Sequence, residues 1–236
     1  MKMPKLTAKN VMFFVLFTAL VLIGSQINFS SVIGAENQYF TLFQFFGPIA
    51  GGFLGSIIGV ASVLFAEILN FFYVGNPLTL LGAVRFLPML FAAYYFASKS
   101  KRFSTVIPLV CMAAFIIHPI GRQVWYYSLF WLVPIAAKFF PERLFLRSLG
   151  STFTAHAIGS AIWIWLIPMP AVAWIALIPV TFVERTLFAA GISVSFVVFN
   201  TVLDKIEAVV PTDFITIEKQ YVLSKEFLKF RALSRF

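Results

Sequence analysis

Charged residues are scarce in this sequence. Asp, Glu, Lys and Arg together make up 11% of its 236 residues, whereas a typical soluble domain carries about 25%. So few charges cannot cover the surface of a large soluble domain, and 61% of the residues are hydrophobic. The composition therefore predicts an all-α, polytopic protein of the cell membrane. At roughly 20 residues for each crossing, the chain is long enough for a bundle of about six or seven transmembrane helices.

Cysteine and histidine are almost absent. Cys111 is the only cysteine and lies within an apolar run, which excludes an intrachain disulfide and a cysteine-based metal cluster. His118 and His156 are the only histidines, and neither belongs to a cluster of carboxylates or to an HExxH spacing. The chain also lacks GxGxxG, Walker A and GxSG-type motifs. We therefore expect no metal, no cofactor and no catalytic residues, and energised transport would need an ATPase from another chain.

Basic residues outnumber acidic ones and give a formal net charge of +9. They lie at the ends of apolar runs and in the C-terminal tail, as is typical of cytoplasmic loops. Membrane lipid is therefore a more plausible partner than nucleic acid. Lys2, Lys5 and Lys9 precede the first apolar run in the manner of a signal peptide. Because that run continues toward Phe29, we favour a retained first helix with a cytoplasmic N-terminus.

Short polar stretches, or stretches with Pro and Gly, separate the apolar runs. We expect residues 1–203 to form the transmembrane bundle and residues 204–236 to form a basic, cytoplasmic tail. Seven apolar runs are present, but both ends are cytoplasmic only if the number of crossings is even. We therefore expect one run not to cross, and we expect residues 123–140, a short run with Pro134, to be an interfacial or bent segment on the cytoplasmic side. This scheme places the basic residues 98–102 outside, against the positive-inside bias. The runs are residues 10–29, 40–73, 79–97, 104–120, 123–140, 149–168 and 176–203.

Four glycines recur at intervals of four residues within one apolar run: Gly47, Gly51, Gly55 and Gly59. A glycine inside a helix costs about 0.5–1 kcal/mol relative to alanine, so four of them need a compensating contact. In a membrane, glycines at i and i+4 form a smooth stripe on which another helix packs closely. We therefore predict that these glycines pack helices together, and that Phe53 beside them faces lipid.

Polar side chains inside apolar runs are costly in lipid and are functional candidates. Glu67 and Arg85 lie in consecutive runs on either side of a short turn. An antiparallel hairpin would bring them to a similar depth. The spacing predicts an ion pair that locks the hairpin, with gating or ligand contact as the alternative.

Aromatic and charged residues also gather near two breaks in the apolar pattern. Trp125 and Tyr126 follow Pro119, where a helix breaks and frees backbone groups. Glu184 and Arg185 stand at the start of the last long run. The Glu184 carboxylate there would either favour the helix dipole or face an aqueous pocket.

The stretch from Phe46 to Gly51, FGPIAG, follows the first loop and precedes further small residues at helical spacing. This pattern resembles the substrate-binding S components of energy-coupling factor (ECF) vitamin transporters. The resemblance implies a compact helix bundle that captures a small vitamin-like solute in its outer half, under the loop from Ser30 to Gln38. A partner transmembrane subunit and ATPases would then drive uptake. The solute-binding residues that we expect are Asn37, Gln38, Trp125, Tyr126, Trp163, Glu184 and Arg185.

Two other functions stay open at this point. One is a small membrane enzyme that acts on a lipid or prenyl substrate with His118, Arg122 and His156. The other is a structural subunit of a larger membrane complex, for which abundant Phe and stripes of small residues suffice.

Overall fold

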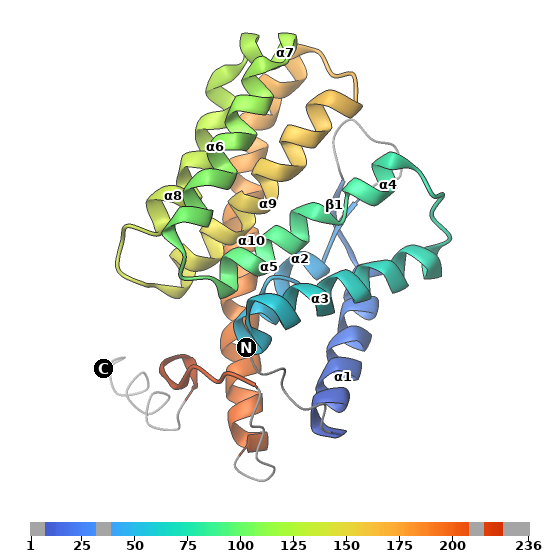
Figure 1. Ribbon diagram of the computed structural model, residues 1–236, viewed down its shortest axis with the longest axis vertical. Coiled ribbons are helices and arrows are strands. Elements are labelled where there is room, and N and C mark those ends of the chain that lie inside the picture. Colours follow the sequence, from blue (N-terminus) through green and yellow to red (C-terminus); the bar gives the residue numbers. More distant parts are fainter. Residues whose placement is uncertain (1–7, 32–38, 208–214, 224–236) are drawn as a thin grey trace, which may run out of the picture.

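The computed structural model describes residues 8–31, 39–207 and 215–223 (Figure 1). Within these residues the chain is helical apart from one two-stranded hairpin, which confirms the all-α class. The elements are α1 (Ala8–Ser25), β1 (Asn28–Ser31), β2 (Tyr39–Thr41), α2 (Phe43–Phe46), α3 (Ile49–Val74), α4 (Leu80–Val84), α5 (Leu87–Ala97), α6 (Lys101–Ile117), α7 (Pro119–Gln123), the 3-10 helix η1 (Trp125–Trp131), α8 (Leu132–Ala137), α9 (Leu144–Leu166), α10 (Ala171–Glu207) and the 3-10 helix η2 (Lys219–Tyr221).

By length and composition alone, three helical segments could cross a membrane, although the first of them is broken at Gly55. They are Ile49–Val74, Leu80–Ala97 and Ala171–Ile206. The membrane character predicted from composition thus has a structural counterpart in these helices.

Local sequence signals set several helix ends. Thr79 and Ser100 precede α4 and α6, and their hydroxyls accept hydrogen bonds from backbone N–H groups in the first turn of each helix. Gly75 ends α3 in the left-handed conformation, with a φ of 73°. Pro119 stands at the first position of α7, where its missing N–H costs nothing.

The part of the molecule drawn in green, yellow and orange is a bundle of antiparallel legs (Figure 1). α9 packs against α6, α8 and α10, and the leg α7–η1–α8 returns alongside α6. Phe115, Trp131 and Trp174 are fully buried in its core, and the Tyr95 hydroxyl donates to the carbonyl of Pro134 at 2.8 Å. Residues 123–140 thus form a bent segment, with the end of α7, η1 and α8 in succession, and Trp131 anchors it inside the bundle; its position relative to the interface stays a prediction.

The second packing unit joins α1, α2, α3 and α5 to α10. Phe53 is 1% exposed and stacks on Phe196 of α10 with ring centroids 4.9 Å apart. Phe96 of α5 meets the same Phe196 ring edge-on at 5.1 Å. The expectation that Phe53 faces lipid is wrong, because α3 turns this ring toward the interior.

The glycine stripe does not form as predicted, because α3 is broken at its centre. Gly55 has a φ of 76° and a ψ of 176°, which no α-helix contains. A Cβ added at Gly59 would lie 2.6 Å from the carbonyl oxygen of Ala50 and 2.6 Å from the Cα of Gly51. These atoms are close only because the chain folds back sharply at Gly55. Gly59 therefore packs on its own chain rather than on a neighbouring helix.

The remaining two glycines do permit close packing with α5. A Cβ at Gly51 would overlap the backbone carbonyl of Ala93, and one at Gly47 would lie 2.6 Å from the Sδ atom of Met89. The predicted role thus holds for Gly47 and Gly51, whereas Gly55 supplies a backbone conformation that L-residues avoid.

The break in α3 is also where the C-terminal segment docks. The N–H of Thr216 donates to the carbonyl of Phe53 at 2.8 Å, and Ile215 is buried. Glu218 pairs with Arg147 of α9 at 2.5 Å. Residues 215–223 therefore pack on the bundle.

The loop between α5 and α6 lies at the same end of the molecule as this segment. Ser98, Lys99, Thr216 and Lys219 line one hollow. The scheme that put residues 98–102 and the tail on opposite sides is therefore wrong.

Replacement of Gly51 by Leu tests the close packing of α3 on α5. The new side chain must displace the backbone of Ala93, and overpacking of this kind costs about 1–3 kcal/mol. We expect a lower midpoint of thermal unfolding in detergent. Ala61→Leu, on the exposed face of α3, is the control and should change little. Equal midpoints for the two variants would contradict the packing role.

Candidate functional site

A cavity of about 370 Å³ lies beside the β hairpin. Its walls come from β2, the C-terminal part of α3, the turn before α4, the start of α5, α9 and α10. The polar and aromatic side chains that line it are Tyr39, Phe40, Gln44, Glu67, Asn70, Phe71, Asn76, Thr79, Arg85, Phe86, Tyr127, His156, Ser160, Trp163, Trp174, Thr181, Glu184 and Arg185.

Three of the solute-binding residues expected from the sequence line this cavity: Trp163, Glu184 and Arg185. Trp125 and Tyr126 do not, because η1 leaves them 51% and 38% exposed on the outer surface and turns the next aromatic residue inward. Asn37 and Gln38 fall outside the described residues.

Glu67 and Arg85 both line the cavity, but no ion pair joins them. No direct contact joins the two charged groups in the described residues, and their role in holding the hairpin together stays a prediction. The hairpin geometry does bring them to the same place, as their symmetric spacing suggested, but the space between the two helices is hollow there. Their opposite charges nevertheless lie close enough to attract one another.

Unpartnered buried polar atoms concentrate at this cavity. In residues 14–31, 39–207 and 215–223, four buried side-chain N or O atoms have no hydrogen-bond partner. Three of them belong to residues that line the cavity: Oε2 of Glu67, Nε1 of Trp174 and Nε of Arg185. An unsatisfied buried polar group costs about 1–3 kcal/mol, so such groups call for a partner.

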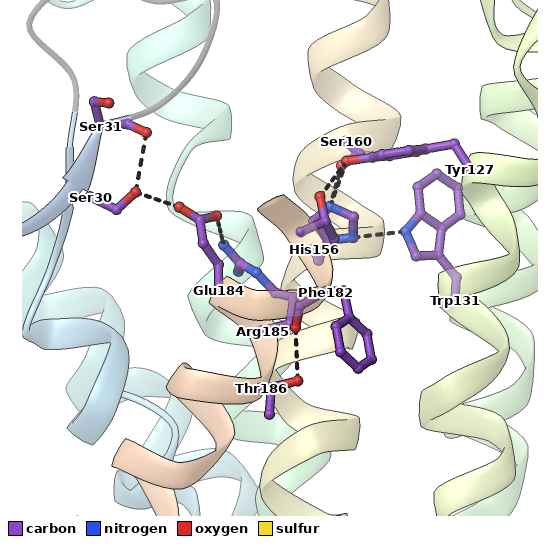
Figure 2. A network of polar contacts seen from close by, with 11 residues as sticks. Ser30, Ser31, Tyr127, Trp131, His156, Ser160, Phe182, Glu184, Arg185 and Thr186 are labelled. Carbon is purple, nitrogen blue, oxygen red and sulfur yellow. Dashed lines mark hydrogen bonds and ion pairs between the residues drawn. The ribbon is translucent and has the colours of Figure 1, made fainter. Parts of the chain in front are cut away.

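Glu184 and Arg185 fasten the β hairpin to α10 (Figure 2). The Ser30 hydroxyl donates to Oε1 of Glu184, and Nη2 of Arg185 lies 3.4 Å from Oε2 of Glu184. The Arg185 guanidinium also lies over the rings of Phe40 and Phe188, at 4.7 and 4.5 Å from their centroids. These contacts close one side of the cavity with the hairpin.

The position of Glu184 also settles the alternative left open by the sequence. α10 begins at Ala171, so Glu184 lies several turns inside the helix. The helix dipole acts only within the first turn, and it does not account for this carboxylate. Glu184 faces the cavity instead.

His156 stands on the opposite wall in a network that fixes its tautomer (Figure 2). The indole N–H of Trp131 can only donate, and it does so to Nδ1 at 3.1 Å. Nδ1 is therefore unprotonated, and the neutral ring carries its proton on Nε2. Nε2 lies 3.0 Å from the hydroxyl of Tyr127 and 3.3 Å from that of Ser160. With both nitrogens occupied, His156 is a structural hydrogen-bonding group and has no free lone pair for acid–base chemistry.

The network extends from His156 to a hydroxyl on the cavity wall. The Nε2–H of His156 can donate to Tyr127 or to Ser160, and the Tyr127 hydroxyl also shares a hydrogen bond of 3.0 Å with Thr181. Thr181 lines the cavity. The network around His156 thus reaches a hydroxyl on the cavity wall.

His118 and Arg122 lie apart from His156, so the three residues do not form the predicted enzymatic group. Nδ1 of His118 accepts from the N–H of Ile120 at 3.3 Å and caps α7. Its ring meets Trp165 edge-on at 4.9 Å, and neither His118 nor Arg122 lines the cavity.

Sequence reasoning missed Trp174, Thr181 and Tyr127 as site residues. Trp174 and Thr181 occur among many similar apolar and hydroxyl residues, and no motif distinguishes them. Tyr127 adjoins two residues that were singled out, and the 3-10 geometry of η1 decides which of the three aromatic side chains turns inward.

No group of three or more His, Cys, Asp or Glu that could hold a metal ion occurs in the described part of the chain. In comparisons with known proteins, no family model, no curated protein and no solved structure matches this chain.

Replacement of Glu184 by Ala should release the hairpin. The variant loses a hydrogen bond to a charged group, which is worth about 1.5–3 kcal/mol. We expect amide hydrogen exchange of β1 and β2 to accelerate about tenfold or more, as measured by mass spectrometry. Thr186→Ala is the control, because the Thr186 hydroxyl bonds only to Phe182 of its own helix. Unchanged exchange in both variants would show that the hairpin is held by other contacts.

Proposed function

We propose that this chain is an integral membrane protein that binds a small solute for uptake, in the manner of an ECF S component. The observation that carries the proposal is the cavity with three unpartnered buried polar atoms on its walls. A bound molecule with matching donors and acceptors would relieve their desolvation cost. The volume of about 370 Å³ falls in the range of about 300–1,000 Å³ that is usual for small-molecule pockets.

The position of the cavity supports binding from outside the cell. α5 begins beside the cavity, at Pro88 and Met89, and ends beside the hollow at Phe96 and Ala97. The two sites therefore lie at opposite ends of this helix. Lys99, Lys138, Arg147 and Lys219 gather at the hollow. By the positive-inside bias this end is cytoplasmic, and the cavity opens toward the other side.

The break in α3 gives an even number of crossings, as is required if both ends of the described chain lie on the cytoplasmic side. Because the chain folds back at Gly55, α3 returns toward the cavity and does not count as a crossing. The remaining legs are α1, α4–α5, α6, α7–α8, α9 and α10, which give six crossings. In this proposed topology both ends of the described chain, and the loop at residues 98–102, are cytoplasmic.

The proposed transport reaction depends on other chains. The sequence carries no nucleotide-binding motif, so a transmembrane coupling subunit and ATPases would supply the energy. The membrane-enzyme alternative loses support, since His156 has both ring nitrogens engaged and lies apart from His118 and Arg122.

Replacement of Gly159 by Trp tests the cavity directly. A Cβ at this position would meet only Cγ of Pro88, at an ordinary distance of 3.7 Å, so an indole there occupies the cavity without displacing backbone. We expect wild-type protein purified in mild detergent to show a small-molecule adduct by native mass spectrometry, and Gly159→Trp to lack it.

Phe145→Trp places the same side chain on the exposed face of the same helix and serves as the control. It should keep both the adduct and the wild-type unfolding temperature. Loss of the adduct in both variants, or its retention in both, would contradict binding in this cavity. Absence of any adduct from wild-type protein, even after incubation with the low-molecular-weight fraction of a cell extract, would overturn the proposal.

A further inference from the structure

We propose that the surface formed by residues 98–102 and 138–143 binds the phosphate headgroup of an anionic phospholipid, whose acyl chains lie along the exposed face of α6. We call the surface of these two loops the basic patch. The inference goes beyond the solute cavity, because it requires helices that lie in a membrane but no bound solute.

The two loops of the basic patch lie at the same end of the bundle (Figure 1). Nζ of Lys138 donates to the carbonyl of Ser98 at 2.6 Å. Nζ of Lys101 lies 5.0 Å from the centroid of the Phe139 ring. These two contacts join the loop between α5 and α6 to the loop between α8 and α9, so the patch is one continuous surface.

Positive charge dominates the basic patch. Arg102 and Arg143 are exposed, and neither has a hydrogen-bond or ion-pair partner among the described residues. Like charges gathered on one surface repel one another, so an anion bound among them relieves this repulsion. The cationic side chains of the two loops are Lys99, Lys101, Arg102, Lys138 and Arg143, and their only carboxylate is that of Glu142.

Neighbouring basic residues outside the two loops already have acidic partners. Arg147 pairs with Glu218, and Lys219 pairs with Asp204. Glu218 of the docked C-terminal segment thus neutralises Arg147 and forms no ion pair with a cation of the patch.

The basic patch borders an apolar surface that suits acyl chains. Phe139 and Phe140 are 65% and 61% exposed. On α6, Arg102 is followed at helical spacing by the exposed residues Val106 and Leu109, so the cation and the apolar side chains share one face. Cations and exposed aromatic rings at the end of an apolar helical face are typical of a membrane–water interface. A phosphate held by the cations therefore places its acyl chains along α6.

An anionic lipid fits this combination better than an acidic protein segment does. An acidic segment would neutralise the cations but would leave the exposed rings and the apolar face of α6 without a partner. A phospholipid covers both, and basic sites at the ends of transmembrane helices bind acidic headgroups. A phosphocholine headgroup carries its own cation, so it gains less from the patch than a phosphatidylglycerol headgroup.

Native mass spectrometry of the full chain tests this inference. Protein purified in mild detergent is incubated with equal amounts of phosphatidylglycerol and phosphatidylcholine that carry the same acyl chains. We expect the wild type to retain about tenfold more phosphatidylglycerol than phosphatidylcholine, because several cations act together at the patch. Equal retention of the two lipids would overturn the inference and would leave the proposed solute binding untouched.

Two charge-removing variants locate the lipid. Arg102→Gln and Arg143→Gln should each retain about fivefold less phosphatidylglycerol, the loss expected for one cation near an anionic lipid. Arg122→Gln is the control, because it removes an exposed arginine beyond the opposite end of α6. All three side chains are exposed, so the variants should unfold at the wild-type temperature. Equal loss in all three variants, or no loss in any, would overturn the assignment to the patch.

Inorganic phosphate distinguishes a lipid site from a site for a free anion. It offers the same charged group without an acyl chain, so it lacks the contacts with α6. We expect inorganic phosphate at the concentration of the lipid to leave the retained phosphatidylglycerol unchanged. Displacement of the lipid by this amount of phosphate would overturn the lipid assignment.

Discussion

The backbone conformation of Gly55 is the constraint on which the rest of this structure depends. Its positive φ ends the helical hydrogen-bonding pattern and turns α3 back on itself, so that Gly59 meets the backbone of Gly51. The returning half of α3 then carries Glu67 to the cavity. The carbonyl of Phe53, which a continuous helix would use internally, accepts instead from the N–H of Thr216. Thr216, about 160 residues further along the chain, thereby supplies the hydrogen bond that the Phe53 carbonyl loses at the break, so this carbonyl is not left unpaired.

The sequence was sufficient for the class of the fold and for part of the site. Low charge and long apolar runs predicted helices able to span a membrane, since both follow from composition alone. Glu184, Arg185 and Trp163 were found because charged and amphipathic residues inside apolar runs are rare enough to stand out. The break at Gly55 was not accessible in the same way. Glycines four residues apart look the same in the sequence whether they form a stripe on a straight helix or include a residue at which the chain turns back. Only the φ angle distinguishes the two cases, and the sequence does not give it.

Glu67 and Arg85 show how far hairpin reasoning reaches. Equal spacing from a turn predicts that two side chains lie near each other, and both do line one cavity. Spacing does not predict whether the space between two helices is filled, and here it is hollow. The opposite charges of Glu67 and Arg85 still attract one another across this hollow, although no direct ion pair joins them. Tyr127 and Trp125 are a second case, because Tyr127 is buried whereas Trp125 is exposed. The 3-10 geometry of η1 decides which of these neighbouring rings turns inward, and composition does not reveal it.

The walls of the cavity differ in how they are held. α9 and α10 are joined by buried rings such as Trp131, Trp174 and Phe115 and by the network around His156, so their separation would expose a large apolar core. The hairpin is short, and one edge of it is tied to α10 by the Ser30 hydroxyl and by the stacking of Arg185 on Phe40. The hairpin also packs through aromatic rings, because Phe29 and Phe40 meet the buried Phe188 ring of α10 at 5.4 and 5.5 Å between centroids. The two residues that hold the hairpin in place, Glu184 and Arg185, also line the cavity, so any molecule bound there would lie beside the contacts that close this wall.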